Sequence, residues 1–138
     1  MRLFLDANVL FSAAHSADGR ARALFTLARL KRCDLLSSPH AIEEARRNLQ
    51  LKYPNETTEL DELVSDLVVT SEAKPENIAW AAAQSLPSED APILAAAVEA
   101  KVDILVTGDR KHFGSMYGKF QRGVKVVSPA QGLAELLE

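Results

Sequence analysis

The chain has 138 residues, of which 47% are hydrophobic and 25% charged, and its net charge is −3. This composition excludes disordered and collagen-like chains, and no apolar run approaches the ~20 residues that a membrane-spanning helix needs. The length predicts a single domain, over residues 1–138, with a substantial hydrophobic core. Asp6 and Asn8 interrupt the N-terminal apolar run, unlike a signal peptide, and the single Cys33 is typical of a reducing compartment, so we expect a cytoplasmic protein.

The charges are unevenly distributed along the chain. Residues 19–52 carry eight basic and three acidic side chains, whereas residues 53–103 carry two basic and eleven acidic ones. A basic segment in a mildly acidic protein is compatible with a polyanionic partner such as a nucleic acid, although solvated helix faces also produce such clusters.

Hydrophobic patterning predicts strands and helices that alternate along the chain. Short apolar or β-branched runs predict five strands, at residues 3–5, 34–37, 67–70, 103–109 and 124–127. Helical spacing and capping residues predict helices at about 19–32, 39–52, 56–66, 74–82 and 88–98, with a short last helix from 129. Asp18, Ser38, Ser88 and Ser128 are the expected caps of four of these helices. The order indicates an α/β fold with a parallel sheet of about five strands and helices on both of its faces.

Acidic residues recur at one predicted edge of this sheet. Asp6 and Asp109 end strands, whereas Glu43 or Glu44, and Asp90 with Glu89, lie near the starts of helices. The carboxyl ends of parallel strands and the starts of the following helices share one rim, where such sheets bind ligands. Carboxylates at close spacing repel unless a cation joins them, and oxygen ligands without clustered Cys or His favour Mg²⁺ or Mn²⁺ over zinc.

Each acid also has a purely structural explanation. Asp6 and Asp109 could cap the segments that follow them, and Glu89 and Asp90 could simply interact with a helix dipole. Glu43 and Glu44 point about 100° apart, so only one of them can face the rim well.

Four segments together resemble the PIN-domain family. They are residues 5–10 (LDANVL), Ser38–Pro39 followed by Glu44, residues 90–97 (DAPILAAA) and residues 106–109 (VTGD). The resemblance spans nearly the whole chain. It implies a three-layer α/β/α sandwich and a metal-dependent endoribonuclease, similar to the VapC-like toxins of type II toxin–antitoxin pairs.

The resemblance also implies a role for individual residues. Asp6, Glu44, Asp90 and Asp109 match the family's metal-binding acids, with Glu43 as the alternative to Glu44. Asn8 and Thr107 match polar residues that position the metal-bound aspartates.

Other residues and partners are expected around these acids. Arg46, Arg47, Arg110 and Lys111 are candidates for contacts with RNA phosphates. His112 could contact phosphate or lie in a solvent-facing loop, and Trp80 could stack on a base or anchor packing. The resemblance implies an RNA substrate, a small antitoxin and a homodimer as partners.

Two alternatives remain from the sequence. A PIN-like fold could bind RNA or protein without catalysis. The chain also resembles haloacid-dehalogenase-like phosphatases around Asp6 and Asp109, but those enzymes carry a second acid where Asn8 stands and usually another where Phe113 stands.

Overall fold

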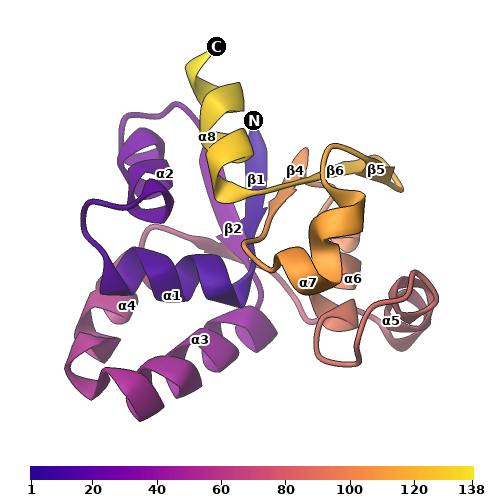
Figure 1. The fold of residues 1–138 in the computed structure, drawn as a ribbon, viewed down its shortest axis with the longest axis horizontal. Coiled ribbons are helices and arrows are strands. Elements are labelled where there is room, and N and C mark those ends of the chain that lie inside the picture. Colours follow the sequence, from indigo (N-terminus) through magenta and orange to yellow (C-terminus); the bar gives the residue numbers. More distant parts are fainter.

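Strand β1 (Arg2–Leu5) lies at the centre of the sheet in the computed structural model, which describes residues 1–138 (Figure 1). The sheet has six strands in the order β3-β2-β1-β4-β6-β5. The other strands are β2 (Asp34–Ser37), β3 (Val68–Val69), β4 (Ile104–Val106), β5 (Phe120–Gln121) and β6 (Val124–Val127). All pairings are parallel except the one between β5 and β6. The predicted α/β class is therefore confirmed, with one antiparallel strand added at the edge.

Eight α-helices connect and cover these strands. They are α1 (Ala7–His15), α2 (Arg20–Arg29), α3 (Pro39–Lys52), α4 (Thr57–Val64), α5 (Pro75–Ala82), α6 (Ala91–Glu99), α7 (Arg110–Phe113) and α8 (Pro129–Leu137). Two 3₁₀ turns, Pro54–Glu56 and Gly114–Met116, follow α3 and α7. None of these helices is both long and apolar enough to cross a bilayer.

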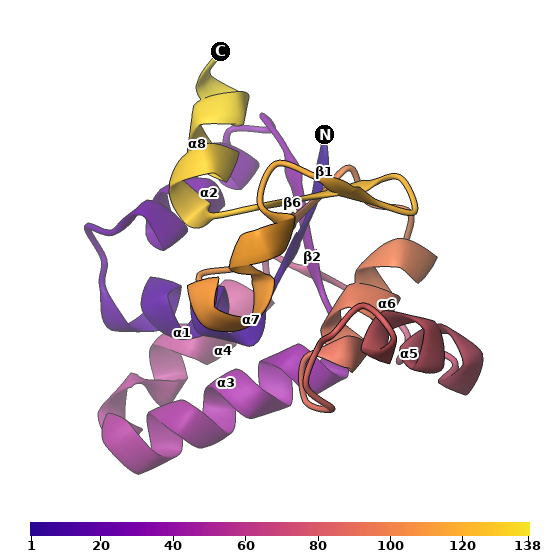
Figure 2. The same ribbon diagram turned by 45° about the vertical axis from the view of Figure 1, so that its right-hand side comes forward.

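The helices form layers on the two faces of the sheet. The strand order requires the chain to move from β1 towards β3 and then back to β4, and right-handed crossovers place these two sets of connections on opposite faces. Helices α2 and α8 pack against each other, and α5 packs against α6 (Figures 1 and 2). Helices α1, α3 and α7 lie towards the carboxyl ends of the strands, away from both chain termini (Figure 1).

The core is built on β1, which has neighbours on both edges and helices on both faces. Leu3, Phe4 and Leu5 are completely buried, as the continuous apolar run predicts. Small residues let helices approach the sheet closely. The alanines of α6 at 95–97 are buried, and a Cβ at Gly132 of α8 would lie 3.4 Å from methyl groups of Val106 and Val127.

Helix α1 and strand β5 were not predicted from the sequence. Helix α1 occupies the apolar stretch between the first strand and the loop at Ser16–Gly19, and it buries Val9, Leu10, Ala13 and Ala14 on one side. Strand β5 pairs with β6 through a tight turn at Arg122 and Gly123, both of which have positive φ. Such turns favour glycine, so Gly123 before the β-branched run could have indicated a hairpin turn at this position.

Two predicted caps are wrong. Gly19, not Asp18, precedes α2, and no side chain caps that helix. Ser88 lies in a turn, and Asp90 occupies the N-cap position of α6 without making a side-chain capping bond. Ser38 and Ser128 do cap α3 and α8 as predicted, and Pro follows each of them.

Candidate metal centre

Asp6 lies at the carboxyl end of β1 and is only 2% exposed. Its Oδ1 accepts the Ala7 N–H over 2.6 Å. Its Oδ2 accepts the Thr107 hydroxyl over 2.8 Å and the Asn8 amide over 3.1 Å. Three donors thus fix the carboxylate at the start of α1, which it also caps.

The environment of Asp6 favours the protonated acid in the absence of a cation. Burial, reinforced by the negative charges of Asp90 and Glu44, raises the pKa of Asp6 to about 6, although the bonds from Thr107 and Ala7 oppose the shift. Asp6 is a buried carboxylate with acidic neighbours and no basic partner, so a nearby cation would favour its ionised form and lower its pKa.

Asn8 and Thr107 tie this carboxylate to the end of β4. The Asn8 side-chain oxygen accepts the Gly108 N–H over 2.7 Å, while its amide nitrogen donates to Asp6. The Thr107 hydroxyl accepts the Asp109 N–H over 3.2 Å. A Cβ at position 108 would lie 3.2 Å from the Asn8 oxygen, so glycine permits this close approach. Asn8 is therefore a link between β1 and β4.

Asp90 and Asp109 meet at the same rim and share a histidine. The His112 Nδ1 lies 2.9 Å from Asp90 Oδ2 and 2.7 Å from Asp109 Oδ2. Ligand atoms of these three side chains all lie within 4.8 Å of one another. Burial and the charge of Asp109 raise the pKa of Asp90, while His112 opposes the shift.

His112 does not lie in a loop, and its side chain is not free. It lies on α7, where Asp109 caps the helix by accepting the His112 N–H over 3.1 Å. The expectation of a solvent-facing loop histidine is wrong. His112 follows Asp109 by three residues, and side chains at this spacing on a helix lie side by side, so the sequence could have predicted this contact.

Helix α3 brings Glu44 towards this group. Glu44 is half-buried, and burial together with the charges of Asp90 and Glu89 raises its pKa, opposed by His40 and Arg47. Glu43, the preceding residue, is exposed. Burial therefore distinguishes the two glutamates, and the charges of Asp90 and Glu89 act on the half-buried Glu44.

The remaining predicted site residues lie on the surface around the acids. Arg46 pairs with Asp61 of α4. Arg47, Arg110 and Lys111 are exposed and make no ion pair. Trp80 is partly buried against the core and carries the Arg122 guanidinium 4.0 Å above its ring, which fits the packing interpretation.

Sequence reasoning missed two hydroxyl groups that support the rim. Ser37, which is fully buried, donates to the Leu5 carbonyl over 2.7 Å. Tyr117 donates to the Thr107 carbonyl over 2.7 Å. Ser37 precedes the predicted cap Ser38, so a polar side chain at a buried strand end could have indicated a hydrogen bond at the rim. No local sequence pattern indicated the bond made by Tyr117.

The donor set fits a hard divalent cation. Asp6, Glu44, Asp90 and Asp109 supply carboxylate oxygens, and no lysine or arginine makes an ion pair with any of them. The pKa values of three of these acids are raised, so the cluster lacks the positive charge that would keep it ionised. Carboxylate oxygens suit Mg²⁺ or Mn²⁺, and the His112 nitrogen lies among the possible ligand atoms beside Asp90 and Asp109.

Comparisons with known proteins agree with this architecture. Residues 2–111 match the family described as PIN domain. No curated protein sequence matches the chain at a significant level.

Three solved structures share the fold at low sequence identity. A chain of the VapBC2 complex of Rickettsia felis, bound to a promoter DNA fragment, has a TM-score of 0.72 at 16% identity, covering 93% of this chain and 98% of that one. The protein PAE2754 of Pyrobaculum aerophilum has a TM-score of 0.72 at 18% identity, with coverages of 99% and 90%. A chain of the FitAB complex bound to an IR36 DNA fragment has a TM-score of 0.54 at 18% identity, with coverages of 92% and 94%.

Proposed function

The chain belongs to the PIN-domain family, and on that premise we propose that it is a Mg²⁺- or Mn²⁺-dependent endoribonuclease. The observation that carries the proposal is the group of acids at the carboxyl edge of the sheet, where Asp90 and Asp109 share His112 and Asp6 is buried beside Thr107. Asp6 and Asp109 also cap α1 and α7, but capping does not explain why Asp90 and Glu44 lie close enough to raise the pKa of Asp6.

Asp6, Glu44 and Asp90 would hold the cation, with Asp109 in support. A divalent ion in such a site neutralises charge on a phosphodiester and lowers the pKa of water. Thr107 and Asn8 hold the Asp6 carboxylate in one orientation by donating to Oδ2, and Asn8 is itself fixed by the Gly108 N–H. Exposed Arg47, Arg110 and Lys111 would bind backbone phosphates on either side of the acids. Arg46 would join them once released from Asp61.

A toxin role within a type II toxin–antitoxin pair is part of the same proposal. The VapBC2 and FitAB structures are complexes bound to DNA fragments. Their likeness to this chain supports the expectation of a small antitoxin partner. We also expect a homodimer, as the family resemblance implies.

The decisive experiment is cleavage of single-stranded RNA by the purified protein with Mg²⁺, with Mn²⁺ and with EDTA. We expect cutting in the first two conditions only, and a loss of at least about a hundredfold in Asp6→Asn, by analogy with the removal of one electrostatic group from a catalytic site. An Asp6→Asn protein that folds normally and cuts RNA at the wild-type rate would rule the proposal out. Absence of cutting together with no Mg²⁺ or Mn²⁺ binding by calorimetry would instead favour a non-catalytic binding module.

A further inference from the structure

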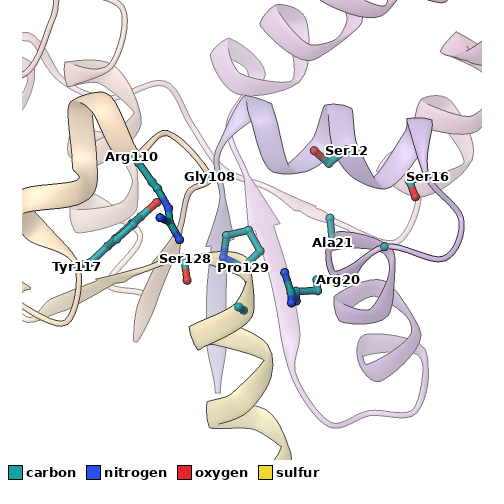
Figure 3. A pocket seen from close by; sticks show the side chains of 11 residues that line it. Ser12, Ser16, Arg20, Ala21, Gly108, Arg110, Tyr117, Ser128 and Pro129 are labelled. Carbon is teal, nitrogen blue, oxygen red and sulfur yellow. The ribbon is translucent and has the colours of Figure 1, made fainter.

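A pocket of about 280 Å³ lies beside the acids, at the carboxyl ends of β4 and β6 (Figure 3). Segments that are far apart in the chain form it: the end of α1, the start of α2, the β4–α7 connection and the start of α8. The polar side chains that line it are Ser12, Ser16, Arg20, Arg110, Tyr117 and Ser128. No acidic residue lines this pocket, in contrast to the metal centre next to it.

Two arginines supply the charge of the pocket. Figure 3 shows Arg20 and Arg110 on opposite sides of Pro129, with Arg110 beside the hydroxyl end of Tyr117. Both arginines are exposed, and neither side chain makes a hydrogen bond or an ion pair. By comparison, Arg22, two residues along α2, donates to the Ala13 carbonyl and pairs with Glu59. The guanidinium groups at the pocket therefore remain available to an anion.

Backbone and hydroxyl groups add to this preference. The N-terminus of α2 borders the pocket at Gly19, and Ser128, whose side chain caps α8, lines the pocket as well. No side chain caps α2, so its first N–H groups have no side-chain acceptor there, and helix N-termini favour anions. The serine hydroxyls can donate further hydrogen bonds. Guanidinium groups bind phosphate through two parallel bonds, so a phosphate matches this lining better than a single-point anion.

The size and position of the pocket suit a backbone phosphate of a bound polyanion. Pockets for small organic ligands span about 300–1,000 Å³, so a space of this volume suits a phosphate group with part of its sugar. Gly108 and Arg110 line the pocket and flank Asp109 of the metal centre. A polyanionic chain whose scissile phosphate lies at the acids would thus have another phosphate near the two arginines.

We propose that this pocket is a phosphate subsite that binds the backbone of the RNA substrate next to the scissile position. The inference rests on the proposed nuclease function for the identity of the ligand. It adds Arg20, Ser12 and Ser16, three residues outside the acidic cluster, to the substrate-binding surface.

The test measures binding and not cleavage, so it does not depend on the metal. A short fluorescein-labelled single-stranded RNA is titrated with protein in EDTA and followed by anisotropy at several salt concentrations. We expect Arg20→Gln to weaken binding by on the order of tenfold and to lower the slope of log K against log salt by about 0.7, the value for one phosphate contact on a single strand. Arg20→Lys should retain the slope and recover part of the affinity, because it keeps the charge but loses the bidentate geometry.

Arg32→Gln is the matched control. Arg32 is exposed and unpaired like Arg20. It precedes β2 and so lies at the amino ends of the strands, whereas the pocket lies at their carboxyl ends. Equal losses in the Arg20 and Arg32 variants, or no loss in either, would overturn the subsite. Because Arg20 makes no bond in the folded protein, its variant should unfold at the wild-type urea concentration, and a lower midpoint would likewise count against the proposal.

Two competition experiments distinguish RNA from other ligands of the pocket. Inorganic phosphate should compete with RNA only weakly, and complete competition at low concentration would assign the pocket to free phosphate. An acidic peptide that displaces RNA from the wild type but not from Arg20→Gln, with higher affinity than RNA, would assign the pocket to a protein partner. If Arg20→Gln loses RNA binding while the wild type never cuts RNA with Mg²⁺ or Mn²⁺, the subsite stands and the nuclease proposal fails.

Discussion

The Thr107 hydroxyl donates to Asp6 Oδ2 over 2.8 Å, although 101 positions separate the two residues in the chain. Both side chains are buried, and the parallel pairing of β1 with β4 brings their strand ends together. The same hydroxyl accepts the Asp109 N–H, so one oxygen atom connects two of the proposed metal-binding acids. Thr107 is therefore a positioning residue for both.

Replacing Thr107 tests this connection. Thr107→Val keeps the shape of the side chain but removes one of the two donors to Asp6 Oδ2 and the acceptor of the Asp109 N–H. We expect a loss of about 1–3 kcal/mol in the free energy of unfolding, measured with urea, and a lower affinity for Mn²⁺ by calorimetry. Thr107→Ser retains the hydroxyl and should keep the wild-type Mn²⁺ affinity. Equal Mn²⁺ affinities in the Val and Ser variants would show that the hydroxyl does not position the acids.

The adjacent glutamates of α3 offer a matched pair of variants. Glu44 is half-buried and responds to the charge of Asp90, whereas Glu43 is exposed. We expect Glu44→Gln to lower the initial rate of RNA cleavage with Mn²⁺ by on the order of a hundredfold, because a removed metal ligand weakens both binding and charge stabilisation. Glu43→Gln should cut RNA at the wild-type rate. The opposite ranking would make Glu43 the ligand.

His112 lies against two of the proposed metal-binding acids, and we expect a bound cation to compete with it for their oxygens. Its ring lies between the oxygens of Asp90 and Asp109, and without it these carboxylates would face each other with no ring nitrogen between them. We expect His112→Ala to lower the melting temperature of the metal-free protein by a few degrees, corresponding to about 1 kcal/mol, and to enlarge the rise produced by Mn²⁺. Lys111→Ala, on the same helix but exposed, is the control. If Mn²⁺ no longer raised the melting temperature of His112→Ala, the imidazole would be a metal ligand itself.

Local patterns were sufficient to predict most of the fold. The strands β1, β2, β4 and β6 each bury at least two apolar residues because helices cover both faces of the sheet, and this burial leaves a clear signature in the sequence. Helix α1 was missed because its nine residues mix apolar and small side chains directly after a strand. Strand β5 has two residues and exists only through its pairing with β6, a contact that no local propensity encodes.

The candidate site was predictable at the level of residue type but not of contacts. Asp6 directly follows β1, as predicted, and the rim position follows because parallel strands all end on the same edge. The predicted strand over residues 103–109 is too long: β4 ends at Val106, and Asp109 reaches the rim as the N-cap of α7. The sharing of His112 between Asp90 and Asp109 depends on how α6 and α7 approach each other, which is a tertiary property. The pocket between α1, α2 and α8 likewise appears only when the helices are packed.

The burial of Asp6 predicts how the stability of the metal-free protein depends on pH. The pKa of Asp6 is raised from 3.8 to about 6 in the folded protein, so the folded state binds a proton at this carboxyl more tightly than the unfolded state does. This group therefore contributes its full stabilisation below about pH 3.8, and the contribution is lost as the pH rises through about 6. The shift of about two pKa units corresponds to roughly 3 kcal/mol over the whole range, of which roughly 1–2 kcal/mol is lost between about pH 5 and about pH 8. The pKa values of Glu44 and Asp90 are raised as well, which acts in the same direction.

Urea unfolding in EDTA at these two pH values, with wild type and Asp6→Asn, isolates this effect. The amide cannot ionise, so Asp6→Asn should lose less stability than the wild type between the two pH values. Asp18→Asn, which removes an exposed carboxylate from the loop before α2, should follow the wild-type profile. Mn²⁺ at the higher pH should stabilise the wild type and not Asp6→Asn, because only the wild type offers the buried carboxylate to the cation. An Asp6→Asn protein with the same pH dependence as the wild type would mean that Asp6 is already ionised in the folded state without metal.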